Sequence, residues 1–155
     1  MATENQNSNH LLLDTLPSAK GLRFALVVSH WNSEITESLY EGAKNFLSQK
    51  NATQIDRIDV PGSFELVYAS RSAIDRDYDA VIAIGSVIRG ETSHFDYVCQ
   101  GVTNGIQQLN ALGKTPVIFC VLTDDNLDQS RARSGGSLGN KGVEAAAAAI
   151  QMARL

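Results

Sequence analysis

Four polar segments of this 155-residue chain each follow an apolar run, and their residue types could bind and transform a small molecule. They are Ser29 to Asn32, Pro61 to Glu65, Gly85 to His94, and Thr123 to Asp125. In the third, Gly90-Glu91-Thr92 brings free backbone N–H groups to the start of a predicted helix, where the dipole also favours an anion. The segment predicts a phosphate site, with an ordinary capped helix start as the alternative.

His94 falls in the first turn of the same predicted helix. The positive end of the helix dipole disfavours an imidazolium there, and a neutral imidazole can accept a proton. Proton transfer is therefore one interpretation of His94, and a surface or packing histidine is the other. The nearby Arg89 is more typical of a solvated charge than of a ligand.

Three other residues also have two interpretations each. Trp31, the single tryptophan, directly follows an apolar run, so it either stacks on a planar ligand or covers the edge of the sheet. Phe119 lies inside an apolar run, which favours core packing. Glu65 comes just after a Pro-Gly turn and is either a favourable first-turn acid or an acceptor for ligand hydroxyls.

The glycine-rich stretch from Gly135 to Gly142 superficially resembles a P-loop. The match fails because Lys141 follows Asn140 instead of a glycine, no Ser or Thr comes next, and no strand leads into the loop. A flexible loop is the simpler interpretation. Its glycines still permit Lys141 and an upstream arginine, Arg131 or Arg133, to converge on one anion.

Alternating strands and helices must position these segments. Four short runs rich in β-branched residues predict strands that are buried on at least one face, and mostly on both, at Phe24 to Val28, Ile55 to Val60, Val81 to Ile84 and Val117 to Leu122. Helical patterns separate and follow them, at Ser33 (as N-cap) to Leu47, Ser63 to Ile74, Thr92 to a closing Gly113, Leu127 to Arg133, and Asn140 to the C-terminus. Crossover helices between strands imply a three-layer α/β/α sandwich with a four-stranded parallel, flavodoxin-like sheet.

Length and charge limit the class of protein. One domain fits residues 21–155, preceded by a polar N-terminal arm over 1–20 that is expected to order only against a neighbouring subunit, anchored by Leu11 to Leu13. With 13 basic and 17 acidic residues, the chain lacks the positive charge that nucleic-acid binding normally requires. The arm's apolar run is too short for a signal peptide or membrane span, so we expect a cytoplasmic protein without a membrane partner.

Cysteine, histidine and alanine placement adds three smaller expectations. Cys99 and Cys120 form no C-x-x-C pair and are expected to be buried and reduced. The three histidines have no metal-ligand spacing, and we predict no metal. Ala145 to Ala149 form a small-residue helical face, which usually packs closely against another element.

Taken together, four ordered motifs resemble those of the lumazine synthase family, and the resemblance runs from Arg23 to Leu155. They are Val60 to Glu65 (VPGSFE), Gly85 to Val98 (GSVIRGETSHFDYV), Leu122 to Asp124 (LTD) and Gly139 to Glu144 (GNKGVE). The resemblance implies a cofactor-independent condensation of 5-amino-6-(D-ribitylamino)uracil with 3,4-dihydroxy-2-butanone 4-phosphate, giving 6,7-dimethyl-8-ribityllumazine, phosphate and water. The substrate amine is the nucleophile in such a reaction, so the protein positions the substrates, binds the anion and transfers protons.

The resemblance also implies residue roles. His94 matches the proton-transfer histidine of the family, and Glu144 matches an acidic position close to it. Arg133 matches the phosphate-binding arginine, acting with the backbone of Glu91 and Thr92.

Substrate contacts are implied for a further set of residues. Trp31, which stands where many members carry Phe, stacks on the pyrimidine, and Phe119 lines the same pocket. The remaining matches are Asn32, Ser63 and Glu65 at the ribityl chain, the backbone of Val87 and Ile88 at the heterocycle, and Lys141 at the substrate.

Members of this family assemble as pentamers or as icosahedral shells of pentamers, with active sites between neighbouring subunits. The resemblance therefore implies a homo-oligomer, with riboflavin synthase as a candidate partner. The spacing from Arg133 to Gly139 has no insertion of the kind found in pentamer-limited relatives, which favours a shell.

Overall fold

A computed structural model describes Leu13 and residues 15–155 of the chain. Four strands form one parallel sheet in the order β2-β1-β3-β4. Their bounds are β1 Arg23–Ser29, β2 Gln54–Val60, β3 Ala80–Ile88 and β4 Val117–Asp124. This order confirms the predicted flavodoxin-like sheet.

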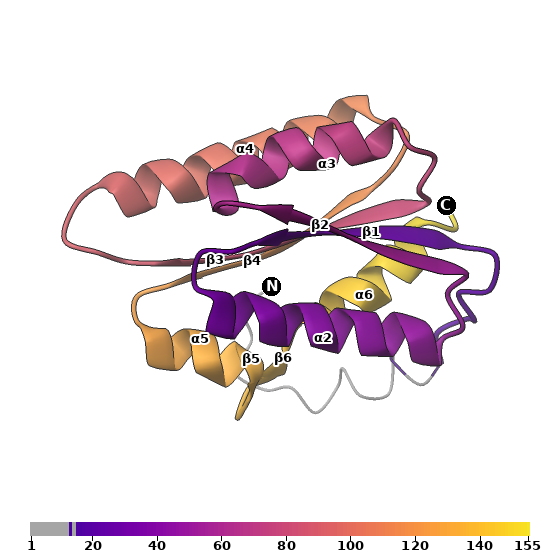
Figure 1. The fold of residues 1–155 in the computed structure, drawn as a ribbon, viewed down its shortest axis with the longest axis horizontal. Helices are drawn as coiled ribbons and strands as arrows, with labels where there is room; N and C mark the ends of the chain where they lie inside the picture. The colour runs from indigo at the N-terminus through magenta and orange to yellow at the C-terminus, as the bar shows by residue number, and fades with distance from the viewer. Residues whose placement is uncertain (1–12, 14) are drawn as a thin grey trace.

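Helices cover both faces of the sheet, as Figure 1 shows with the sheet nearly edge-on. Helices α3 and α4 lie on one face, and α2, α5 and α6 lie on the other. The helical elements are α2 Ser33–Gln49, the 3₁₀ turn η1 Ser63–Glu65, α3 Leu66–Ile74, α4 His94–Leu112, α5 Leu127–Arg133 and α6 Lys141–Met152. The predicted three-layer sandwich is therefore confirmed.

Alternation along the central strands builds two separate cores, because successive strand residues point to opposite faces. On one face, Leu26 of β1 and Ile82 of β3 are fully buried against helices α2 and α6. On the other, Val27 and Ala83 are fully buried against α3 and α4. The edge strand β2 is mostly half-buried, so the expectation of burial on both faces holds for the central strands and not for β2.

Three local details differ from the sequence-based expectation. Strand β3 continues to Ile88, so Gly85 to Ile88 belong to the strand rather than to the segment after it. The N-cap of α2 is Asn32, and Ser33 is the first helical residue, because Asn32 adopts the left-handed conformation that ends the preceding turn. The glycine-rich stretch folds as an antiparallel hairpin of β5 Ser134–Gly136 and β6 Gly139–Asn140.

The predicted small-residue face of α6 packs on α2 within the same chain. Ala146 and Ala149 are fully buried there. At the start of α6 the approach is so close that a Cβ atom on Gly142 would lie 1.9 Å from the carbonyl oxygen of Leu39. A glycine at position 142 is therefore needed for this helix pair to pack.

The described part of the predicted arm lies against the domain. The backbone N–H of Ala19 donates to the carbonyl of Lys50, the Ser18 hydroxyl donates to the same carbonyl, and the Ala19 side chain is fully buried. Leu11 and Leu12 of the expected anchor lie outside the described residues. None of the helices in the described ranges is long and apolar enough to cross a membrane.

Candidate active site

A cleft of about 670 Å³ opens where β1 and β3 end and where η1 and α4 begin. Ligands of open α/β sheets bind at this carboxyl edge, because the loops after the strands converge there. Seven of the predicted site residues line it: Trp31, Ser63, Glu65, Val87, Ile88, Thr92 and His94. The fold thus gathers residues that are more than 60 positions apart in the sequence.

Asn32 braces the end of β1 against the end of β3. Its backbone is left-handed, with φ of 58°, and its side-chain Nδ2 donates to the carbonyl oxygen of Ser86 at 2.9 Å. One residue earlier, the N–H of Trp31 donates to the carbonyl of Pro61 at 3.2 Å. These two bonds fix the loop that carries Trp31 to both neighbouring strand ends.

The Trp31 side chain is 72% exposed and lines the cleft. A tryptophan that covered the sheet edge would be largely buried, so the exposure favours the stacking interpretation. A broad exposed indole beside a cleft offers a flat surface to a planar heterocycle.

His94 is the first residue of α4, and its backbone N–H lies 3.4 Å from the Thr92 hydroxyl oxygen. Before it, the backbone N–H groups of Gly90, Glu91 and Thr92 donate to no acceptor within the described part of the chain. Unused N–H groups at a helix start can bind an anion directly. The predicted phosphate site therefore has donors available next to His94.

Ser63 contributes a second unused polar group to the cleft. Its hydroxyl is buried and has no hydrogen-bond partner in the described structure, while Glu65 from the same 3₁₀ turn is exposed. A buried hydroxyl without a partner is unfavourable unless a ligand or water binds it. Ser63 and Glu65 are thus suited to bind the hydroxyl groups of a ligand.

The other predicted residues do not line this cleft in a single chain. Asn32 and Glu91 adjoin it, Phe119 lies on the edge strand β4, and Arg133, Lys141 and Glu144 belong to α5 and α6 on the opposite face of the sheet. The core packing expected for Phe119 is wrong, because β4 is an edge strand and leaves this ring 41% exposed.

Lys141 and Glu144 form an ion pair at the start of α6. The lysine Nζ donates to both carboxylate oxygens at 2.8 Å, and both side chains are at least two-thirds buried.

Nearby on β4, burial raises the pKa of the Cys120 thiol to about 12, with Glu144 adding to the effect. Both cysteines are free, as expected, although Cys99 is only half-buried.

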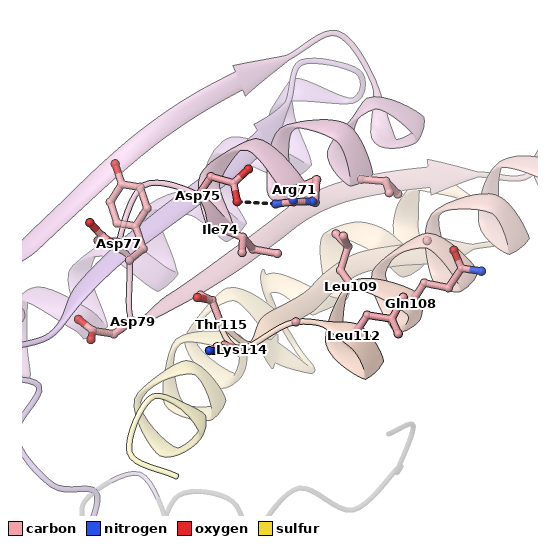
Figure 2. A pocket seen from close by; sticks show the side chains of 14 residues that line it. Arg71, Ile74, Asp75, Asp77, Asp79, Gln108, Leu109, Leu112, Lys114 and Thr115 are labelled. Atoms are coloured by element: carbon pink, nitrogen blue, oxygen red, sulfur yellow. Dashed lines mark hydrogen bonds and ion pairs between the residues drawn. The ribbon is translucent and has the colours of Figure 1, made fainter.

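A second hollow, of about 820 Å³, lies at the opposite end of the sheet, between the ends of α3 and α4 (Figure 2). It is lined by apolar residues such as Ile74 and Leu109, and by the Arg71 to Asp75 ion pair. None of the predicted site residues lies there. The amino ends of parallel strands do not usually hold the ligand, so the smaller cleft is the candidate site.

Several apolar residues line the cleft but were not predicted as site residues from the sequence. They are Pro61, Phe64, Phe95, Tyr97 and Val98. Helical spacing could have identified two of them, because residues three and four positions after His94 share its side of the helix. Among the residues that the structure describes, no group of three or more His, Cys, Asp or Glu side chains could hold a metal ion.

Comparison with known proteins identifies the family of the chain. The sequence profile described as 6,7-dimethyl-8-ribityllumazine synthase matches residues 21–155. The chain belongs to this family. Three curated relatives carry the same description.

The relative from Christiangramia forsetii is 53% identical over 163 residues, which cover all of this chain and 95% of the relative. The relative from Flavobacterium johnsoniae is 56% identical over 156 residues, covering 99% and 82% of the two chains. The relative from Porphyromonas gingivalis is 48% identical over 158 residues, covering 100% and 98%. The resemblance seen in the sequence is therefore confirmed over the whole domain.

Proposed function

We propose that the chain condenses 5-amino-6-(D-ribitylamino)uracil with 3,4-dihydroxy-2-butanone 4-phosphate to give 6,7-dimethyl-8-ribityllumazine, phosphate and water in riboflavin biosynthesis. The match of the family profile to residues 21–155 carries this proposal. A cleft with an exposed tryptophan, unused N–H donors and a histidine suits a planar heterocycle and a phosphate. The reaction needs no protein nucleophile and no cofactor, because the pyrimidine amine attacks the ketone itself.

In the proposed reaction, the amine and the ketone form an imine with loss of one water, and removal of a proton expels phosphate to leave an enol. The enol becomes a ketone, and the ribitylamino nitrogen attacks its carbonyl carbon and closes the ring with loss of a second water. Trp31 stacks on the pyrimidine, and the backbone of Val87 and Ile88 contacts its polar edge. Ser63, Glu65 and Asn32 contact the ribityl chain. Holding both substrates in this way accelerates their reaction mainly by orientation.

Proton transfer and anion binding complete the proposed site. His94 accepts and returns protons, with Glu144 close to it. The departing phosphate is bound by the guanidinium of Arg133 and by the N–H groups of Glu91 and Thr92.

We further propose that two copies of the chain complete each site. Phe119, Arg133, Lys141 and Glu144 do not line the cleft of their own chain, so a neighbouring copy would supply them. Rings of such contacts would give a pentamer, and the spacing from Arg133 to Gly139 favours a shell of pentamers. Light scattering that detects only pentamers across pH and concentration would refute the shell.

Two further expectations follow from this role: riboflavin synthase as the partner that consumes the product, and a cytoplasmic location. The alternative, a non-catalytic protein that binds riboflavin or forms a shell, is not favoured. Family membership points to catalysis, and neither alternative needs a phosphate site beside a histidine.

A fluorescence assay tests the proposed function. The full chain is mixed with both substrates, and formation of the lumazine is followed after subtracting the spontaneous reaction. Product formation in proportion to protein concentration is expected. A rate at background, measured with folded protein that still binds riboflavin or the pyrimidine, would exclude the enzyme and favour the binding protein.

A further inference from the structure

Asp124, at the end of β4, is a buried carboxylate that the proposed reaction does not use. Its side chain is 9% exposed. One carboxylate oxygen accepts a hydrogen bond from the Ser130 hydroxyl at 2.7 Å, and the other lies 3.9 Å from Nε of Arg133. Burying a carboxylate is costly unless charges or donors surround it. Ser130 and Arg133 therefore offset the cost of burying the Asp124 carboxylate.

The guanidinium of Arg133 makes one hydrogen bond and one longer ion-pair contact within the chain. Nη1 donates to the carbonyl of Gln129, one turn earlier in α5, at 3.0 Å, and Nε faces Asp124. Nη2 has no partner in the part of the chain that the structure describes. Since the group is planar and rigid, fixing two nitrogens also fixes the direction of the third.

We propose that Asp124 is a positioning residue, which together with the Gln129 carbonyl holds the Arg133 guanidinium in the orientation that binds the phosphate of the substrate. This inference rests on the proposed function, in which Arg133 binds that phosphate. Ser130 supports Asp124 in turn, through a hydroxyl that is fully buried.

A purely electrostatic role for Asp124 would have the opposite effect on phosphate binding. A carboxylate beside Arg133 reduces the positive potential that attracts an anion, so removing its charge would strengthen phosphate binding if charge alone mattered. If Asp124 orients the guanidinium, removing it weakens phosphate binding instead. The sign of the change therefore separates the two roles.

The experiment uses the full chain with the substitutions Asp124→Asn, Ser130→Ala and Arg133→Ala, and the double variant of Asp124→Asn with Arg133→Ala. The KM of each substrate and the inhibition constant of inorganic phosphate are measured. For Asp124→Asn we expect phosphate and the ketose phosphate to bind about tenfold more weakly, because the Arg133 guanidinium loses the carboxylate charge that it faces at 3.9 Å. The KM of the pyrimidine should change less than about twofold, because Asp124 acts only through the phosphate site.

The supporting variant, a control and the double variant sharpen the result. Ser130→Ala should weaken phosphate binding in the same direction but less, without altering the charge of the site. Asp128→Asn is the matched control. Asp128 lies on α5, the helix that carries Ser130 and Arg133, but it is 93% exposed and is near Arg131 rather than Arg133. We expect Asp128→Asn to leave both KM values unchanged. The double variant should bind phosphate no more weakly than Arg133→Ala alone.

Unchanged or tighter phosphate binding in Asp124→Asn would overturn the inference, as would additive effects in the double variant. If Asp124→Asn does not fold, Ser130→Ala decides in the same way, with unchanged phosphate binding counting against the inference. If Arg133→Ala itself leaves phosphate binding unchanged, the proposed phosphate site is wrong. That outcome is distinct from a failure of Asp124 alone.

Discussion

The guanidinium carbon of Arg89 lies 4.1 Å from the centre of the Phe95 ring. From the same position, Nε of Arg89 donates to Asp125 at 3.0 Å and Nη1 donates to Asp96 at 3.2 Å. The sequence context of Arg89 indicated a solvated charge. The structure shows instead that Arg89 contacts an aromatic ring and two carboxylates. It connects the end of β3 with the start of α4, where His94 lies, and with the loop after β4.

Replacing Arg89 should loosen the start of α4. Exposed ion pairs and exposed cation–π contacts contribute little to stability, so Arg89→Gln should leave the fold intact. Hydrogen exchange of the hydrogen-bonded amides at residues 89, 96 and 97 should become faster, while exchange in β1 stays the same. Arg71→Gln, which breaks a single exposed ion pair on α3, is the control and should not affect this segment.

Replacing His94 tests its role in proton transfer. His94→Ala should lower kcat by about 100-fold, near the lower end of the usual contribution of a general acid or base, with a modest change in KM. Steady-state kinetics with both substrates provide the measurement. His30→Ala is the matched control, because His30 is exposed beside Asp59 and does not line the cleft. Equal kcat values for the two variants would remove His94 from the reaction.

Both cysteines should react more slowly in the native chain than in the denatured chain. Because burial raises the pKa of Cys120 from 9.0 to about 12, its thiolate fraction at pH 8 is far lower than that of an ordinary thiol. Iodoacetamide should therefore modify Cys120 in the denatured chain and leave it intact in the native one. Burial also raises the pKa of Cys99, but its half-exposed side chain permits slow modification. Rapid native labelling of Cys120 would contradict its burial.

Glu37 should contribute stability that depends on pH. The bidentate hydrogen bonds from Arg57 lower the pKa of Glu37 below its ordinary 4.5. A carboxylate with a lowered folded-state pKa stabilises the fold above pH 4.5, and this contribution disappears as the pH falls through the folded-state value. Since Glu37 is partly exposed, Glu37→Gln should reduce the free energy of unfolding at pH 7 by only about 0.5 kcal/mol.

Urea unfolding at pH 7 and at several values below pH 4.5 measures this effect. The difference between Glu37→Gln and the parent chain should shrink as the pH falls. Glu41→Gln serves as a control on the same helix, because Glu41 contacts Lys44 at 3.7 Å without bidentate bonds. A difference that stays constant at every pH would show that Glu37 acts by packing instead of by charge.

Two glycine variants should differ sharply in stability. A Cβ on Gly142 would meet the backbone carbonyl of Leu39, which cannot move without separating α2 from α6. A Cβ on Gly101 would meet the Phe64 ring, which is more than half exposed and can rotate away. Gly142→Ala should therefore lower the free energy of unfolding by about 3 kcal/mol or more, and Gly101→Ala by about 1 kcal/mol at most. Similar losses in chemical denaturation would contradict this account.

Much of the fold could be predicted from the sequence because strand and helix patterns alternate clearly. Buried runs such as Phe24 to Val28 and the helical stripe with Val102 and Ile106 both correspond to observed elements. The ends of elements were harder to predict. Pairing of Ile88 with Asp124 extends β3 beyond its apolar run, and such pairing depends on the neighbouring strand.

The candidate site was predictable only in part. Residues after strand ends, such as Trp31 and His94, could be found because parallel strands all end at one edge. The burial of Phe119 was predicted wrongly from the apolar residues around it in the sequence. Strand order decides which apolar strand lies at an edge, and no local pattern contains that order. The partners of Arg133 and Arg89 depend on long-range geometry that spacing cannot reveal.

The exposed indole of Trp31 also provides an intrinsic fluorescence signal for ligand binding. Trp31 is the single tryptophan, so the whole tryptophan emission comes from one ring at the rim of the cleft. Occupancy of the cleft should shift or quench that emission without any attached dye. Rapid mixing could then resolve the arrival of each substrate in real time, separately from the appearance of product.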